Sequence, residues 1–108
     1  MTDAAMTQLI RRYFELAPQP DSDAYFAQFA NQATVEDEGT EYCGVEAIRR
    51  WRASVPLVAY LVHTVQDING GVDAAVDIAG DFPGSPVRLT FHFEHDTGGR
   101  ITKLTIRP

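Results

Sequence analysis

The sequence predicts an α+β fold, in which three N-terminal helices pack on a curved, mostly antiparallel sheet. Apolar residues recur at helical spacing in the first half of the chain. In the second half, long stretches of strand-like composition are separated by turn sequences. Helices and strands that are segregated in this way are typical of α+β proteins. A chain of 108 residues has the length of one domain, so we expect residues 1–108 to form a single domain.

The three helices are expected at residues 4–16, 23–30 and 45–54. The apolar residues of the first recur every three or four positions: Met6, Leu9, Ile10, Tyr13, Phe14 and Ala17. Pro18 follows the first helix and Pro56 follows the third, and proline disfavours helical backbone in the residue before it.

Strands are expected at residues 33–38, 57–68, 72–82, 87–95 and 101–106, with a short return strand at 41–43. Asn69, Gly70 and Gly71 form a hairpin turn signal between two of them. In the last strand, Ile101 and Leu104 depart from strict alternation, which indicates a bulge or burial on both faces.

The segment Ala33 to Gly39, ATVEDEG, contains three consecutive acidic residues at the end of an expected strand. Strand alternation places Glu36 on one face, and it places Asp37 on the other face together with Val35. Asp37 is therefore either an acid in an apolar pocket or an exposed carboxylate before the turn at Gly39.

Composition and charge exclude several classes of function. The net charge of −6 and the nine Lys and Arg residues argue against binding to nucleic acids or anionic membranes. Cys43 is the only cysteine, and the three histidines show no zinc-binding spacing, so neither a metal nor an organic cofactor is expected. No apolar stretch approaches membrane-spanning length, and no signal peptide is recognised, so we expect a cytoplasmic protein.

Three stretches of the sequence resemble the nuclear transport factor 2-like superfamily, which includes SnoaL-like proteins and has a cone-shaped α+β fold. They are LIRRYFEL, YFAQFANQATVEDEGTEYCGVEAIRRW and FEHDTGGRITKLTI, and together they extend over nearly the whole chain. The resemblance is specific for the fold and much weaker for activity, because one fold supports many functions.

Within that superfamily the sequence is most similar to ketosteroid isomerases. The resemblance of RYF places Tyr13 as an oxyanion-hole donor, and that of ATVED places Asp37 as the general base. It implies an isomerase that moves a proton beside a carbonyl on an apolar cyclic ligand. The family's second donor, an aspartic acid, is replaced by Leu89 or Phe91, and a helix tyrosine is replaced by Arg52.

Other residues are candidates for the wall of a ligand pocket: Phe14, Phe26, Phe29, Trp51, His63 and Phe91. Tyr13 is alternatively a core tyrosine without a catalytic role, and His92 is expected to face solvent or a second subunit. The cluster Arg49, Arg50 and Arg52 is interpreted as a solvated helix face, with Arg52 alternatively reaching an acidic ligand or a strand carboxylate.

Two further interpretations remain open beside the enzyme. The same fold would serve a protein that binds a small apolar molecule without catalysis, or a dimerisation module. Thr64, Gln66 and Thr90 are expected on the outer face of the sheet, where they could pair with a second copy, and we therefore expect a homodimer.

Overall fold

Three helices and six strands make up the described part of the chain, which is residues 3–19, 22–68 and 70–108 of a computed structural model. The helices are α1 (Asp3–Leu16), α2 (Asp23–Phe26) and α3 (Val45–Ser54). The strands are β1 (Phe29–Asp37), β2 (Thr40–Cys43), β3 (Ala59–Ile68), β4 (Gly71–Ala79), β5 (Val87–His95) and β6 (Ile101–Arg107).

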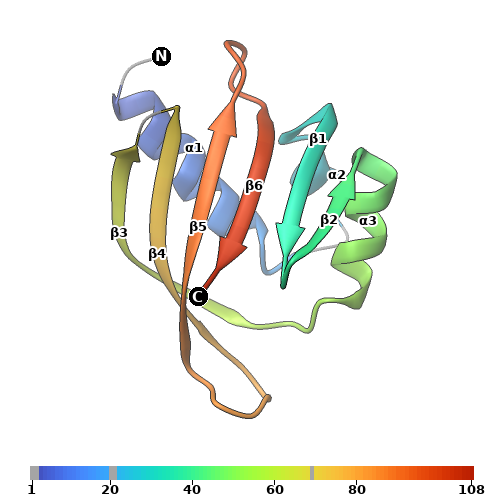
Figure 1. The fold of residues 1–108 in the computed structure, drawn as a ribbon. Coiled ribbons are helices and arrows are strands. Elements are labelled where there is room, and N and C mark those ends of the chain that lie inside the picture. Colours follow the sequence, from blue (N-terminus) through green and yellow to red (C-terminus); the bar gives the residue numbers. More distant parts are fainter. Residues whose placement is uncertain (1–2, 20–21, 69) are drawn as a thin grey trace.

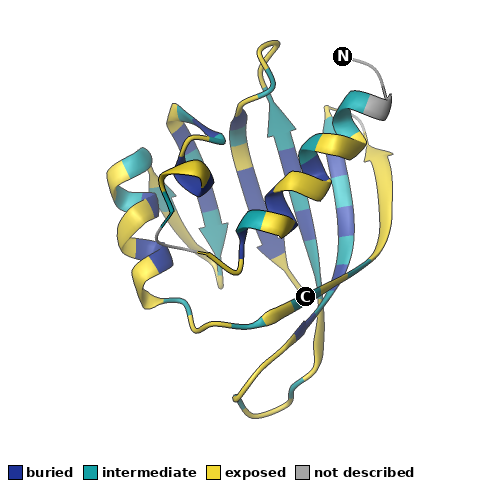
Figure 2. Ribbon diagram, turned by 180° about the vertical axis from the view of Figure 1, so that it is seen from behind, coloured by how far each residue is buried: buried dark blue, intermediate teal, exposed yellow. Residues whose placement is uncertain are grey.

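The strands form one sheet in the order β2-β1-β6-β5-β4-β3 (Figure 1). Neighbouring strands are antiparallel except for β1 and β6, which run parallel. All three helices lie on the same face of the sheet, as Figures 1 and 2 show from opposite sides. We call this the inner face. The predicted α+β fold with a mostly antiparallel sheet is confirmed.

The apolar stripe of α1 forms the centre of the core. Tyr13 is 1% exposed, and its ring lies 5.1 Å from that of Phe93, centroid to centroid. The ring of Phe14 lies 5.2 Å from that of Phe91 in an edge-to-face arrangement. The stripe therefore packs α1 against the inner face of β5, and this packing fixes the position of Tyr13 on the inner face.

The second helix is shorter than predicted. α2 is capped by the Ser22 side chain, which accepts a hydrogen bond from the Tyr25 backbone N–H at 3.1 Å, but it ends at Phe26 rather than Ala30. Phe29 instead begins β1 and pairs with Ile101 of β6. Pairing with a strand far along the chain outweighs local helical preference in this stretch.

The alternation predicted for β1 is confirmed. Val35 is fully buried, whereas Glu36 on the opposite face forms an ion pair with Arg107 of β6 at 2.9 Å. Glu38 and Gly39 both have positive φ angles, 52° and 76°, and they turn the chain into β2. Asp37 is therefore the last residue of β1 on the inner face.

Bulges change which residues face inward in two places. The bulge predicted near Ile101 is confirmed by a shift in the pairing of β5 with β6 between Glu94 and His95. A second bulge, not predicted, lies in β3 between Val62 and Thr64, so His63 has no partner in β4. The second bulge reverses the facing of the β3 residues after it, so Leu61 and Val65 point to opposite faces.

The start of β3 and the end of β4 also differ from the prediction. β3 begins at Ala59, leaving Leu57 outside the strand and 72% exposed. β4 ends at Ala79, so Phe82 lies in the long loop that leads to β5. Of the predicted hairpin turn between β3 and β4, Asn69 lies outside the described residues, while Gly70 has a φ of 80°.

Candidate functional site

A cavity of about 410 Å³ lies between the inner face of the sheet, α1, α3 and the segment that follows α3. It is at the end of the sheet where β1 and β6 finish and from which the β4–β5 loop extends, the lower end in Figure 1. Much of its wall is apolar: Val55, Val58, Ile78, Phe82, Leu89, Phe91 and Ile106. Polar side chains and further aromatic ones also line it: Tyr13, Asp37, Glu38, Thr40, Tyr42, Trp51, Arg52, Ser54 and Tyr60.

Asp37 enters the cavity from the end of β1. Its Oδ2 accepts a hydrogen bond of 3.0 Å from the indole Nε1 of Trp51 in α3. Among the described residues Oδ1 has no hydrogen-bond partner, so this oxygen remains able to accept a proton. A carboxylate held at one oxygen and free at the other, beside an apolar wall, has the geometry that a general base requires.

Tyr13 contributes a neutral hydroxyl to the same cavity. Its hydroxyl forms a hydrogen bond of 2.7 Å with that of Tyr25, in which either oxygen can be the donor. Burial raises the pKa of Tyr13 well above its ordinary value, because a phenolate would be poorly solvated in the core. Tyr13 therefore stays protonated and able to donate a hydrogen bond.

Arg52 is buried, contrary to the prediction that the arginine cluster forms a solvated face. Of the three arginines in the cluster, only Arg49 and Arg50 are exposed. Its Nη2 donates to the backbone carbonyl of Ala17 at 2.6 Å, and its Nη1 donates to the Tyr60 hydroxyl at 3.4 Å. The end of α1 therefore covers a residue that the helical pattern alone leaves exposed.

The cavity brings together some of the predicted site residues and not others. Asp37, Tyr13, Trp51 and Phe91 all line it. Three of the predicted wall residues are buried in the core and are not among the lining residues: Phe14, Phe26 and Phe29. The latter two pack instead around the ring of Tyr25, which fills the space behind Tyr13.

His63 lies on the outer face of the sheet and not in the cavity. Residues opposite one another in the β3–β4 pair point the same way, so Leu61 points outward with Asp77 and Val65 inward with Ala74. His63 points outward with Leu61, and its Nε2 lies 2.8 Å from Asp77 Oδ2. The bulge between Val62 and Thr64 turns only the residues after it, so Val65 lies on the opposite face from His63.

Sequence reasoning missed several residues of the cavity. Tyr60 and Ile78 point inward as an opposed pair in β3 and β4, and alternation with buried Val76 would have identified Ile78. Tyr42 lies on β2, and its ring centroid is 6.2 Å from that of Trp51. Phe82 comes from the β4–β5 loop, for which the sequence carries no comparable signal.

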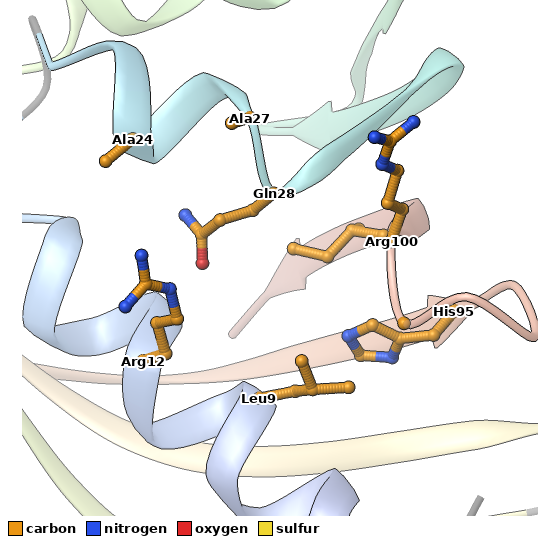
Figure 3. Close-up of a pocket in the computed structure, with 9 residues that line it drawn as sticks. Leu9, Arg12, Ala24, Ala27, Gln28, His95 and Arg100 are labelled. Carbon is orange, nitrogen blue, oxygen red and sulfur yellow. The ribbon is translucent and has the colours of Figure 1, made fainter.

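A second, smaller hollow of about 220 Å³ lies near the β5–β6 turn, at the opposite end of the sheet (Figure 3). In Figure 3, Leu9 and Arg12 of α1, Gln28 and His95 surround it. The Nδ1 of His95 is buried and has no hydrogen-bond partner among the described residues. Burial lowers the pKa of His95.

His92 occupies a contrasting position on the outer face. Its Nδ1 lies 2.6 Å from Asp73 Oδ1, and its Nε2 lies 3.0 Å from Glu94 Oε2. Partial burial alone would lower the pKa of His92, but the two carboxylates outweigh it and raise that pKa above the ordinary 6.5. The prediction that His92 faces away from the core is confirmed by this placement.

The two histidines should tilt the pH dependence of stability in opposite directions. The raised pKa of His92 stabilises the fold at low pH, and that contribution is lost as the pH rises through the pKa of the folded state. The lowered pKa of His95 favours the fold above the unfolded pKa, and that contribution is lost as the pH falls.

Urea unfolding at about pH 5.5 and about pH 8.5 measures both effects. The His92→Gln variant should lose more stability at the lower pH, and the His95→Gln variant should lose less there than at the higher pH. A loss of stability that varies with pH in the same direction in both variants would contradict these placements.

The described residues, 3–19, 22–68 and 70–108, contain no group of three or more His, Cys, Asp or Glu side chains arranged to hold a metal ion. In the same ranges, no helix is both long and apolar enough to cross a membrane.

Sequence identity to a protein of known structure identifies the family. A candidate polyketide cyclase from Sinorhizobium meliloti is 35% identical to this chain, with 93% of this chain and 94% of that one covered and a TM-score of 0.81. This chain belongs to the family of that protein. No family model matches the sequence.

Two solved structures with lower sequence identity are similar to this chain in fold alone. An NTF2-like protein of unknown function from Cytophaga hutchinsonii is 16% identical, with 94% of this chain and 87% of that one covered and a TM-score of 0.76. The epoxide hydrolase/cyclase-like enzyme SalBIII, from pyran ring formation in salinomycin, is 19% identical, with 99% and 93% covered and a TM-score of 0.77. The predicted nuclear transport factor 2-like fold is confirmed, and two of these three solved structures are named as a cyclase or a cyclase-like enzyme rather than specifically as a ketosteroid isomerase.

Proposed function

We propose that this protein transfers a proton beside a carbonyl group of an apolar, cyclic small molecule, in the manner of ketosteroid isomerases and SnoaL-like cyclases. One observation carries the proposal: Asp37 and Tyr13, a carboxylate and a neutral hydroxyl, line the same largely apolar cavity. Proton abstraction next to a carbonyl needs a base for the carbon-bound proton and a hydrogen-bond donor for the oxygen that becomes negative.

The step follows from these two groups. Asp37 accepts a proton from the carbon beside the carbonyl, and the C–H electron pair forms a carbon–carbon double bond. The carbonyl π electrons move to the oxygen, which becomes an enolate oxygen and accepts a hydrogen bond from Tyr13. Asp37 then returns the proton to another carbon of the conjugated system, which regenerates the carboxylate.

The Tyr13 hydroxyl is already hydrogen-bonded to the Tyr25 hydroxyl, and either oxygen can be the donor in that bond. When Tyr13 donates a hydrogen bond to the substrate oxygen, Tyr25 donates one to Tyr13. A chain of two hydroxyls polarises the terminal donor, which strengthens it towards a developing negative charge.

Hydrogen–deuterium exchange tests the function directly. β,γ-unsaturated cyclic ketones, including a 5-ene-3-keto steroid, are incubated with the protein in heavy water and followed by NMR and by the absorbance of the conjugated product. We expect exchange above the protein-free rate with the wild type and little above it with Asp37→Asn. Equal rates in the two proteins, whether both active or both inactive, would contradict Asp37 as the base.

A binding protein without catalysis is the second candidate, favoured by the replacement of the expected second oxyanion donor by Leu89 or Phe91, both of which line the cavity. Thermal stabilisation by several cyclic ketones together with no exchange in any of them would support this candidate instead.

The outer sheet face suggests the oligomeric state. By their pairing with Asp73 and Ala75, Gln66 and Thr64 point outward from β3, and Thr90 points outward from β5. We propose that this polar face pairs with a second copy to form a homodimer. Sedimentation at micromolar concentration should give the mass of two chains, and a monomer there would contradict the proposal.

A further inference from the structure

The charge of Arg52 is unusual for a side chain so deeply placed. It is 5% exposed, and it carries a guanidinium that stays protonated at any pH at which proteins fold. Within residues 3–19, 22–68 and 70–108, no carboxylate oxygen lies within 4.0 Å of its nitrogens, although a buried cation ordinarily has such a partner.

The partners that Arg52 does have are all neutral. Two of its five N–H groups donate, one to the Ala17 carbonyl and one to the Tyr60 hydroxyl. Its guanidinium carbon also lies 4.8 Å from the ring centroid of Tyr25, a cation–π contact. These contacts hold the side chain in place but leave its positive charge uncompensated.

Arg52 and Tyr60 both line the cavity. The distance of 3.4 Å from Arg52 Nη1 to the Tyr60 hydroxyl oxygen is long for a hydrogen bond. A ligand oxygen placed between the two groups would receive shorter bonds from both. Asp37 and Glu38 line the same cavity, but among the described residues neither carboxylate lies within 4.0 Å of an Arg52 nitrogen, so base and cation are separate.

We propose that Arg52 and Tyr60 form an anion subsite, so that the ligand of this cavity is a cyclic compound carrying a carboxylate or another ionised oxygen such as an enolate. The inference rests on the proposed use of the cavity and narrows its substrate class. A cation in a site of low dielectric selects anionic over neutral ligands of the same shape.

Calorimetry with a matched pair of ligands tests the subsite. Naphthalene-2-carboxylate and naphthalene-2-carboxamide have nearly the same shape and differ by one charge. The wild type should bind the carboxylate about tenfold to a hundredfold more tightly, as expected for hydrogen bonds to a charged group. Equal affinities, or tighter binding of the amide, would overturn the proposal.

Two variants assign the preference to the proposed residues. Arg52→Met should remove this preference, whereas Arg50→Met, two residues earlier and exposed on the same helix, should keep it. Because Arg52 also ties α3 to the end of α1, Tyr60→Phe supplies a variant with a smaller effect on folding, and it should weaken carboxylate binding severalfold while leaving amide binding unchanged. A folded Arg52→Met protein that still prefers the carboxylate would overturn the assignment.

The result of the binding test can be distinguished from the result of the deuterium-exchange test of catalysis. Preference for the carboxylate without deuterium exchange in any ketone would retain the subsite and reject the catalytic function. Exchange without any preference for the anion would retain the function and reject the subsite.

Discussion

Replacing Asp37 by asparagine should lower kcat for enolisation by about 10² to 10⁴, the range that a positioned general base contributes. The amide has nearly the shape of the carboxylate, and its oxygen can still accept the 3.0 Å hydrogen bond from Trp51. Fold and cavity should therefore be retained, so that the loss falls on the proton transfer. Steady-state kinetics with a β,γ-enone, together with the rate of solvent deuterium incorporation, measure it.

Glu36→Gln is the matched control for this variant. It lies one position away on β1, points to the opposite face and pairs with Arg107, so it removes the same charge outside the cavity. Its kcat should stay near that of the wild type. Comparable losses in both variants would mean that the negative charge of the strand, rather than a base in the cavity, supports the activity.

Phe93→Ala should lower the free energy of unfolding by about 3–5 kcal/mol, the usual cost of removing a buried phenylalanine ring. Phe93 is 0% exposed on the central strand β5, and it lies between Val72 of β4 and Leu104 of β6. Its ring also meets that of Tyr13, so the deletion leaves a cavity beneath the proposed oxyanion donor. Urea unfolding monitored by circular dichroism gives the value.

Leu57→Ala provides the comparison for the core deletion. Leu57 is 72% exposed, so its replacement should change the free energy of unfolding by no more than about 0.5 kcal/mol. A domain of this size has a total stability of about 5–15 kcal/mol, so the two variants should be clearly distinguishable. Similar losses in both would contradict the central place of Phe93 in the core.

Local patterns were sufficient to predict most of the elements and the faces on which two residues of the candidate site lie. Period-two alternation in β1 places Asp37 beside Val35 on the inner face, and period-3.6 spacing in α1 places Tyr13 on its buried stripe. These predictions succeed because each depends only on near neighbours in the chain.

The placement of other residues depends on contacts that no local pattern encodes. Arg52 is buried because the Ala17 carbonyl, 35 residues earlier, accepts its hydrogen bond. Val65 points inward although Leu61 points outward, because one extra residue in β3 is unpaired and a bulge reverses the facing of every residue beyond it. Phe29 is extended rather than helical because it pairs with Ile101.

The parallel pairing of β1 with β6 also has a consequence for how the protein acquires its site. Asp37 lies opposite Ile106 in that pair, so the strand carrying the proposed base gains this neighbour only from β6, far along the sequence. During synthesis, α1 and the β1–β2 hairpin emerge long before this partner exists. Closing so long a loop is entropically costly and slows folding. The cavity is therefore expected to form late, in one step with completion of the sheet, and a ribosome-bound chain lacking β6 should bind no ligand.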